Sequence, residues 1–495
     1  MILLGIDVGS SSVKVSLLDA GSGKNLASAQ YPKQEMKIIS KKAGWAEQNP
    51  EDWWQNIIYA LRDISHNNQL DLKSVEAIGI TYQMHGLVCV DKDKNVLRPS
   101  IIWCDSRAVE IGNKAFADLG SQVCLSKLLN SPGNFTASKL KWVKENEPDL
   151  YKKIYKIMLP GDYIAMKLTG KINTTVTGLS EGMFWDFPNN QLADFLLKYY
   201  GISPDFIPEI VPAFGMQGEL LKDVASELGL KSNIPVTYRA GDQPNNAFSL
   251  NVLNPGEIAA TAGTSGVVYG VTDKYSYDPE SRVNIFAHVN HLSSKARLGV
   301  LLCVNGTGIL NSWVQKNVGS KISYSEMNEQ ASQVPIGSEG LTIIPFGNGA
   351  ERVIGNKNPG CQISNLNFNI HNYTHVIHAA QEGIAFSFKY GIDIMAKYTG
   401  LVVSQIRAGH ANMFLSPVFR ETLASIAGVP IDLYNTDGSE GAARGAGIGS
   451  GIYKSSAEAF SNLEKLSTVE PVSNKADKYA EAYQNWFSTL NKMLN

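Results

Sequence analysis

The sequence predicts an α/β fold made of two domains, and three observations support this. The chain has 495 residues, more than a single hydrophobic core normally holds. A strand, a small polar loop and a second strand occur near the start and again near the middle. Segments with strand and helix character also alternate along the chain, which is typical of α/β proteins rather than of all-α or all-β ones.

The first strand pair lies at the amino terminus. Apolar runs at residues 2–6 and 13–18 flank the loop DVGSSS at residues 7–12, and we expect a β-hairpin there. The same pattern returns at residues 257–269, where the loop reads AGTSG. This recurrence indicates two related domains that each begin with a hairpin, although chance repetition of a small-residue turn is an alternative.

The remaining segments complete the predicted order. In sequence, the signals indicate a helix at 52–64, a strand at 75–81, a helix at 137–145, a strand at 235–238, and helices at 373–397 and 414–427. From residue 476 the apolar side chains fall on one helical face, which predicts an amphipathic helix packed on the body. We place the boundary near residues 244–254, giving domains at 1–245 and 246–495.

Composition excludes several classes of protein. Hydrophobic residues make up 44% of the chain and charged residues 18%, as in soluble globular proteins. The net charge of −2 supplies no basic field for nucleic acid or an anionic membrane. The longest apolar runs, such as residues 298–304, are too short to span a bilayer, and no signal peptide is apparent. The five cysteines are scattered, which favours reduced thiols. We therefore expect a cytoplasmic protein.

The two hairpin loops are candidates for phosphate binding. Small residues let backbone N–H and hydroxyl groups approach phosphate oxygens, and Asp7 adds a carboxylate suited to Mg²⁺ shared with those phosphates. Asp-x-Gly is also a common turn in which the Asp bonds its own backbone. The first loop alone favours that simple turn, but the pair of loops favours phosphate binding. No Walker-type phosphate loop sequence follows a strand.

Asp242 is the candidate general base. It follows the predicted strand at 235–238 and begins a helix in which Pro244 suits the first turn. A helix N-terminus favours the ionised carboxylate, which can accept the proton of an attacking hydroxyl group. The alternative is that Asp242 is simply the N-cap of the helix. Sequence alone leaves both interpretations open.

Three histidines at helical spacing, His371, His375 and His378, suggest a metal site. No acidic or cysteine partner is evident, so we expect a surface helix instead. The glycines at 445, 447 and 449 match part of a dinucleotide motif, but the small residues around them favour close helix packing. Trp53 and Trp54 are expected to pack at the start of a helix.

Taken together, these motifs resemble the FGGY carbohydrate kinases over nearly the whole chain. The matching segments, in order, are GIDVGSSSVK at 5–14, WAEQ at 45–48 with Trp53-Trp54, QMHG at 83–86, IIWCDSR at 101–107, FTA at 135–137 with Lys139-Leu140, LP at 159–160 with Asp162-Tyr163, GD at 241–242, GTSG at 263–266, ER at 351–352 and EG at 382–383. Each segment alone is weak evidence, whereas the ordered set is specific.

The resemblance implies a two-domain actin-like ATPase fold with ribonuclease-H-like cores, which binds ATP and Mg²⁺ in a central cleft and closes on binding. It implies Asp242 as the general base and Asp7 as the metal ligand. The acceptor would be bound by Met84, His85, Asp105 and Asp242, with Arg107 bordering the pocket. The nucleotide would be bound by Ser10, Ser11, Lys14, Gly263, Thr264, Gly409 and Asn412.

Within this resemblance, QMHG at 83–86 is the segment that most favours D-xylulose as the acceptor over glycerol or ribulose, which implies D-xylulose 5-phosphate as the product. Residues 407–412 depart from the family, because relatives usually have three glycines there, and this leaves the adenine contacts open. Ala262 and Gln243 also differ from many relatives without affecting the chemistry. The alternatives are a kinase for ribulose, gluconate or glycerol, or a catalytically silent nucleotide- or sugar-binding protein. Dimers are common among similar proteins, so a homodimer also remains open.

Overall fold

The computed structural model describes residues 1–68, 70–318 and 322–495 and forms two compact units. Unit 1 comprises Met1–Leu253, Ile285–Leu298 and Thr436–Leu463, and unit 2 comprises Asn254–Asn284, Gly299–Asn435 and Glu464–Asn495. The sequence-based domains, 1–245 and 246–495, divide the chain into two consecutive halves. In the structure the chain first leaves unit 1 after Leu253 and then returns to it twice.

The core of unit 1 is a mixed sheet, with strands in the order β13-β14-β5-β1-β2-β3. These strands are β1 (Ile2–Val8), β2 (Val13–Asp19), β3 (Asn25–Tyr31), β5 (Val75–Tyr82), β13 (Phe214–Glu219) and β14 (Pro235–Gly241). β1 and β2 form the predicted antiparallel hairpin, closed by a bond from Gly9 N–H to Ser12 O of 3.0 Å. β5 runs parallel to both β1 and β14.

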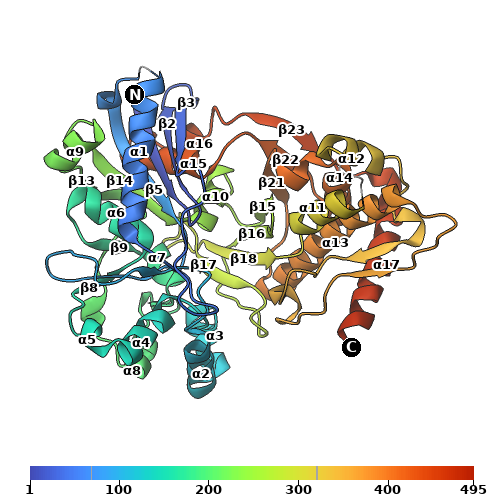
Figure 1. Ribbon diagram of the computed structural model, residues 1–495, viewed down its shortest axis with the longest axis horizontal. Coiled ribbons are helices and arrows are strands. Elements are labelled where there is room, and N and C mark those ends of the chain that lie inside the picture. Colours follow the sequence, from blue (N-terminus) through green and yellow to red (C-terminus); the bar gives the residue numbers. More distant parts are fainter. Residues whose placement is uncertain (69, 319–321) are drawn as a thin grey trace. The chain divides into compact units, whose positions relative to one another are not determined.

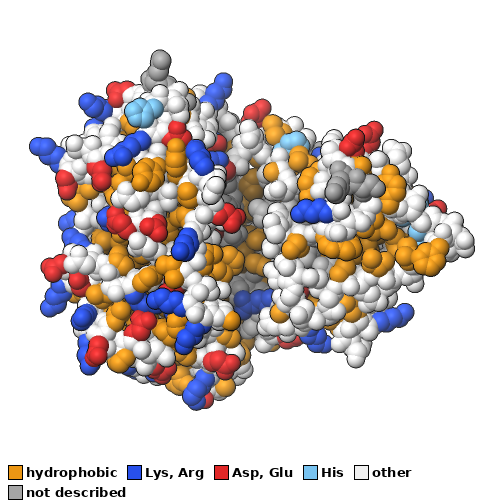
Figure 2. Space-filling view, viewed as in Figure 1, with side chains coloured by type: hydrophobic (Ala, Val, Ile, Leu, Met, Phe, Trp, Pro, Cys, Tyr) orange, Lys and Arg blue, Asp and Glu red, His pale blue; other side chains and the backbone are white. Residues whose placement is uncertain are grey.

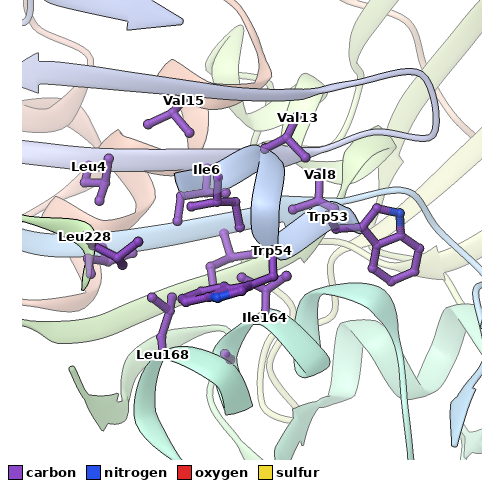
Figure 3. Packing of buried hydrophobic residues seen from close by; sticks show 14 of the residues in the cluster. Leu4, Ile6, Val8, Val13, Val15, Trp53, Trp54, Ile164, Leu168 and Leu228 are labelled. Atoms are coloured by element: carbon purple, nitrogen blue, oxygen red, sulfur yellow. The ribbon is translucent and has the colours of Figure 1, made fainter. Parts of the chain in front are cut away.

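Helices α1 (Pro50–Asn68) and α6 (Pro160–Thr169) pack on one face of this sheet. Leu4 and Ile6 of β1 point to that face, where the predicted packing of Trp53 and Trp54 is confirmed (Figure 3). Leu3 points to the other face and joins a second apolar cluster that includes residues of α15 (Gly438–Gly449). Because successive side chains of β1 point to opposite faces of the sheet, this one strand contributes to two separate apolar clusters.

Helix α15 lies against β1, β5 and β14 although it comes late in the chain (Figure 1). A Cβ on Gly5 would lie 1.8 Å from the Ser439 carbonyl oxygen, and one on Gly79 would lie 2.0 Å from that of Ala442. A Cβ on Gly445 would meet the Tyr238 ring at 2.5 Å. The prediction that the glycines of this segment serve close packing is confirmed.

The other elements of unit 1 are short and surround this core. They are β4 (Glu47–Gln48), η1 (Leu72–Ser74), β6 (Val88–Val90), β7 (Ser100–Ile101), α2 (Val109–Leu119), α3 (Ser121–Leu128), α4 (Thr136–Asn146), α5 (Pro148–Tyr151), β8 (Lys156–Met158), β9 (Asn173–Thr175), α7 (Val176–Glu181), β10 (Trp185–Asp186), β11 (Gln191–Leu192), α8 (Asp194–Tyr200), η2 (Pro204–Phe206), β12 (Glu209–Val211), α9 (Lys222–Leu228), α10 (Asp242–Ser249) and α16 (Ser456–Ala459). The predicted helices at 52–64 and 137–145 and the strands at 75–81 and 235–238 are thus confirmed.

Unit 2 repeats the arrangement of hairpin and parallel neighbour. Its sheet includes, in this order, β18 (Leu298–Val304), β16 (Gly266–Thr272), β15 (Glu257–Ala262), β21 (Gln405–Gly409), β22 (Ile431–Tyr434) and β23 (Lys465–Val469). β15 and β16 are antiparallel, and β15 runs parallel to β21. The second predicted hairpin is therefore confirmed.

The helices of unit 2 include the long α13 (Tyr373–Thr399), which matches the prediction. The others are α11 (Gly308–Asn317), α12 (Tyr324–Ala331), α14 (Pro417–Ala427) and α17 (Ala476–Leu494), with η3 (Ser338–Gly340), β19 (Thr342–Ile344), η4 (Arg352–Ile354), β20 (Gln362–Ser364), η5 (Asn412–Leu415) and η6 (Ser473–Lys475). α14 begins at Pro417, three residues later than predicted, because Ser416 caps it through a bond from Phe419 N–H of 3.2 Å.

α17 is the predicted amphipathic helix. Trp486 is 1% exposed and donates from Nε1 to the Ile343 carbonyl oxygen at 3.0 Å.

The prediction of a surface helix around the histidines is wrong. His378 is 5% exposed and lies 3.2 Å from a Glu382 oxygen one turn along α13. His375 also lies 3.2 Å from Glu339, which belongs to η3. These histidines can be buried because carboxylates lie beside their imidazole groups. The sequence spacing of such buried histidines is the same as that of exposed ones, so the spacing did not predict their burial. Within the described ranges no three His, Cys, Asp or Glu side chains converge on a metal position.

The surface carries mixed charge. On the face drawn in Figure 2, basic and acidic side chains are interspersed, in agreement with the net charge of −2. None of the helices in the described ranges combines the length and apolar character that a bilayer span requires.

Candidate active site

The parallel strands of unit 1 bring distant residues together at one edge of the sheet. β1, β5 and β14 are neighbours with the same direction, so their carboxyl ends meet there. Asp7 lies near the end of β1, and Asp242 directly follows β14. Residues 83–85 follow β5 and are tied to β1 by a bond from Gln83 N–H to Val8 O of 2.8 Å. This edge gathers three of the segments that the sequence singles out.

Asp7 and Asp242 are both buried carboxyl groups with raised pKa values. Burial, followed by the charges of Asp242 and Asp437, raises the pKa of Asp7 to about 7. Burial also raises the pKa of Asp242 to about 7, although N–H groups at the start of α10 oppose the shift. The expected stabilisation of ionised Asp242 by the helix terminus is therefore real but weaker than the cost of burial.

Asp242 does not cap its helix. Gly241 occupies the N-cap position of α10, and Asp242 is the first helical residue. Its Oδ1 atom is buried and finds no hydrogen-bond partner in the part of the chain that the structure describes. The N-cap position therefore belongs to Gly241 and not to Asp242, and one carboxylate oxygen of Asp242 is left available for a proton or a ligand.

Lys14 of β2 forms an ion pair with Asp437, which caps α15. Burial alone would raise the pKa of Asp437, but Lys14 and hydrogen bonds from Ser439 and Glu440 together lower it. The opposite shifts of Asp437 and Asp7 follow from this pairing, because Lys14 bonds directly to Asp437. Lys14 also acts on Asp7 by charge, but there burial and two carboxylates outweigh it.

The first hairpin loop is tied to its surroundings through Ser10. Gln48 Nε2 donates to the Ser10 carbonyl oxygen at 2.6 Å, and Trp103 Nε1 donates to Ser10 Oγ at 3.2 Å. Gln48 Oε1 in turn accepts a bond from Gln83 Nε2 at 3.1 Å. Ser11 is exposed at the tip of the loop. Gln48 therefore links the loop with the segment at 83–85.

Met84 and His85 form the next part of this edge. Met84 is 4% exposed, and His85 has a left-handed backbone with φ of 63°. The His85 carbonyl oxygen accepts a bond of 2.8 Å from Lys139 Nζ, and its ring contacts Phe135 at a centroid distance of 4.7 Å. Burial lowers the pKa of Lys139 to about 7.

Asp105 is placed nearby but its carboxylate is fully engaged by protein donors. It is 0% exposed, and Oδ2 accepts from Ala46 N–H at 2.5 Å and from Arg107 at 2.7 Å. The Arg107 guanidinium also bonds Glu47 at 2.7 Å and lies over the Trp45 ring at 3.9 Å. In the structure Asp105 therefore anchors Arg107, and its contact with an acceptor stays a prediction.

Three of the predicted nucleotide residues line one pocket of unit 2. Gly263, Thr264 and Asn412 border a pocket of about 1110 Å³ together with parts of α11, α12 and α14. The loop is joined to α11 by bonds from Gly308 N–H to Gly263 O of 3.0 Å and from Ile309 N–H to Thr264 O of 3.1 Å. Gly409 ends β21 three residues before Asn412. The size of the pocket suits a nucleotide-sized ligand.

A buried glutamine organises this pocket from below. Gln381 of α13 is 0% exposed, donates to Asn328 at 2.8 Å and accepts from Ser416 Oγ at 2.7 Å. Asn328 and Ser416 both line the pocket. Sequence reasoning missed Gln381, because its partners are distant in the chain. It also missed Asp437 and Glu181, which the structure places beside Asp7 and His85.

The acidic edge of unit 1 fits a magnesium ion. Mg²⁺ typically takes only one or two carboxylates and fills its remaining positions with phosphate oxygens and waters. Asp7 would supply such a carboxylate, and a cation would relieve the neighbouring charges of Asp242 and Asp437, which together with burial raise the pKa of Asp7. A cage of several protein ligands is not required for this role.

Comparison with known proteins agrees with these features. Residues 2–249 match the model of the N-terminal domain of the FGGY family of carbohydrate kinases, and residues 258–449 match that of its C-terminal domain. The xylulose kinase of Bacillus subtilis is 30% identical over 100% of this chain and 98% of its own. That of Escherichia coli is 30% identical over 90% of this chain and 88% of its own.

Solved structures share the fold at lower identity. The xylulose kinase of Rhodospirillum rubrum has a TM-score of 0.89 and 22% identity, covering 100% of both chains. The gluconate kinase of Lactobacillus acidophilus gives 0.89 and 22%, and the glycerol kinase of Plasmodium falciparum gives 0.88 and 20%, each covering 100% of this chain and 98% of the other. The fold is therefore that of the two-domain α/β actin-like ATPases.

The chain belongs to the FGGY family of carbohydrate kinases. It is accordingly a phosphotransferase for which ATP is a substrate, and the expectation of an enzyme of this kind is confirmed.

Proposed function

We propose that this chain transfers the γ-phosphoryl group of ATP to O5 of D-xylulose, with Asp242 as the general base. The observation that carries the proposal is the unpartnered, buried Oδ1 of Asp242 at the strand edge that also holds Asp7. The choice of acceptor is supported by two relatives of about 30% identity that are xylulose kinases. The sequence QMHG at 83–86 also favours it.

In the proposed reaction, Asp242 accepts the proton of the O5 hydroxyl group as that oxygen attacks the γ-phosphorus. The new P–O bond forms as the bond to the β,γ-bridging oxygen breaks, and ADP leaves. With a pKa of about 7, Asp242 is substantially ionised at neutral pH and basic enough to take the proton. The remaining acceleration comes from positioning and from stabilising the charge of the transferring group.

The other residues position the two substrates. Met84 and His85 would orient the sugar, while Ser10, Ser11 and Lys14 would bind transferring phosphate oxygens. Gly263 and Thr264 would bind the nucleotide phosphates, and Gly409 and Asn412 would lie near the nucleoside. Mg²⁺, held through Asp7, would supply positive charge to the phosphate oxygens. The cytoplasm as its location and a homodimer as its assembly are part of the same proposal.

A coupled ATP-turnover assay with D-xylulose, ribulose, gluconate and glycerol tests the acceptor. We expect turnover with D-xylulose to be at least tenfold above that with each of the other three compounds. Preference for another sugar would contradict the acceptor, and nucleotide binding without turnover would contradict catalysis altogether.

The Asp242→Asn variant tests the base. We expect kcat to fall by about 10²–10⁴-fold, the usual contribution of a general base, with unchanged circular dichroism. Asp223→Asn, an exposed position in α9, is the matched control and should retain full activity. Turnover of Asp242→Asn within a few-fold of the parent would rule out the assigned role.

A further inference from the structure

His85 has a backbone conformation that its neighbours must hold in place. Its φ of 63° lies in the left-handed region, which is unfavourable for a residue with a Cβ atom. Such conformations persist where surrounding contacts fix them, and they concentrate at functional sites. The residues that fix His85 are therefore part of the construction of the acceptor site.

Glu181, the last residue of α7, contacts His85 in two ways. Burial raises the pKa of its carboxyl group, while the backbone N–H of His85 acts as a hydrogen-bond donor towards that group and lowers the pKa. Its own carbonyl oxygen lies 3.0 Å from His85 Nδ1. Glu181 is 1% exposed, so these bonds are shielded from water and costly to lose.

The opposite side of His85 is held by Lys139. Lys139 Nζ donates to the carbonyl oxygen of His85 at 2.8 Å and to that of Ile102 at 3.0 Å. The His85 ring packs against Phe135 and Phe286, at centroid distances of 4.7 and 5.3 Å. Buried side chains from other segments thus engage both the N–H and the C=O group of His85.

Glu181 also packs against the residue before Asp242. A Cβ on Gly241 would lie 2.5 Å from Glu181 Oε2 and 2.6 Å from Met84 Cγ. The strand end that carries Asp242 is therefore in van der Waals contact with the same carboxyl group that holds His85. Glu181 therefore lies against two residues: His85, which follows Met84 in the sequence, and Gly241, which precedes Asp242.

We propose that Glu181 is a positioning residue for the acceptor: by bonding the backbone of His85 and packing on Gly241, it fixes the acceptor-binding segment relative to Asp242. The inference rests on the proposed function of this site and adds a residue outside every motif that the sequence shares with the family. Glu181 acts through His85, and this role requires a side chain at position 181 that has a hydrogen-bond acceptor and is similar in size to glutamate.

Two substitutions separate this role from simple structural support. Glu181→Leu keeps the approximate volume but removes the carboxyl oxygen that faces the His85 N–H, so we expect KM for the acceptor to rise at least about tenfold, with KM for ATP within twofold. Glu181→Gln keeps an acceptor oxygen and should restore acceptor KM to within about threefold of the parent. Unchanged acceptor KM in Glu181→Leu, or equal damage in Glu181→Gln, would overturn the proposal. If Glu181→Leu does not fold, Glu181→Ala, which also removes the acceptor oxygen, takes its place in the comparison with Glu181→Gln.

A double-mutant cycle with His85→Gly adds a readout that general destabilisation would not give. Glycine adopts the left-handed conformation without support, so Glu181→Leu should raise acceptor KM less than threefold further in that background. Independent, multiplying effects would contradict action through His85. The acceptor in these assays is whichever sugar the parent phosphorylates, so failure with D-xylulose contradicts the proposed acceptor without bearing on Glu181.

Discussion

The ammonium group of Lys14 pairs with the carboxylate of Asp437, which lies 423 positions further along the chain. The pair joins the amino-terminal hairpin to the start of α15, beside Asp7. It balances one of the three carboxylates that the fold concentrates there. The arrangement places a single positive charge where anionic phosphates are expected to bind.

Lys14→Met should weaken ATP binding. Without the ammonium group, the charge of Asp437 is uncompensated beside Asp7, so negatively charged phosphates bind less well. We expect KM for ATP to rise about tenfold, equivalent to about 1.4 kcal/mol, with acceptor KM nearly unchanged. Steady-state kinetics with Lys24→Met, an exposed site after β2, provide the control. An unaltered KM for ATP would show that Lys14 serves only the fold.

Asp105→Asn should destabilise the protein more than it affects sugar binding. Asp105 is buried and paired with Arg107 at 2.7 Å, and breaking a buried ion pair costs about 3–5 kcal/mol. Urea unfolding measures this loss. Asp118→Asn, which removes the exposed partner of Lys114, should leave the unfolding free energy nearly unchanged. A stable Asp105→Asn protein with a raised acceptor KM would instead favour direct contact with the sugar.

Gly79→Ala should disrupt the packing of α15 on the sheet. The added Cβ would lie 2.0 Å from the Ala442 carbonyl oxygen, so backbone must move, at a cost of about 3 kcal/mol. Gly21→Ala is a matched control, because its Cβ would meet only Asp19 Oδ2, at 3.7 Å. Equal unfolding midpoints in urea for the two variants would contradict the close approach.

His288 should make the protein sensitive to acid. Burial lowers the pKa of His288 to about 3, and its Nε2 atom lies 3.0 Å from the Val252 carbonyl oxygen. The unfolded chain takes up the proton near pH 6.5, so this contribution to stability is complete above that pH and is lost as pH falls towards 3. Between pH 7 and 5 the loss should be about 2 kcal/mol.

His288→Gln removes the titrating group while keeping an N–H donor. Its unfolding free energy should therefore fall less than that of the parent over the same pH range, by about the amount given above. Parallel pH profiles for the two proteins would show that His288 does not contribute.

Gln381→Leu should impair the nucleotide pocket from beneath. The substitution removes the bonds that hold Asn328 and Ser416, and we expect ADP to bind about tenfold more weakly in titration calorimetry. Gln362→Leu, on the exposed strand β20, should bind ADP like the parent. Unchanged affinity in Gln381→Leu would show that the pocket keeps its shape without this network.

Much of the fold is predictable because local patterns determine it. Both hairpins, α13 and α17 follow from apolar periodicity and turn residues within a few positions of one another. The start of α14 was missed by three residues, although Ser416 and Pro417 form a normal helix start. The burial of His378 escaped prediction, since an imidazole buried beside Glu382 has the same sequence spacing as one on a surface.

The site was predictable where residues sit in short motifs and was missed where strand order brings them together. Asp7 and Asp242 stand next to recognisable loops, so their types and positions suggested a role. Their proximity depends on β5 lying between β1 and β14, which no local pattern encodes. Glu181 and Asp437 occupy ordinary helix ends. Their importance is seen only in the structure, where Glu181 contacts His85 and Asp437 pairs with Lys14.

The late position of α15 has a consequence for how the protein is made. A ribosome has completed all of the unit 1 sheet by Gly241, yet the helix that covers the glycine-lined face of β1 and β5 begins only at Gly438. While nearly two hundred further residues are synthesised, that face of the sheet remains uncovered. Nascent chains stalled before α15 should therefore be protected from protease only on the side packed by α1 and α6, and protection of the opposite face should appear once translation has passed Gly449.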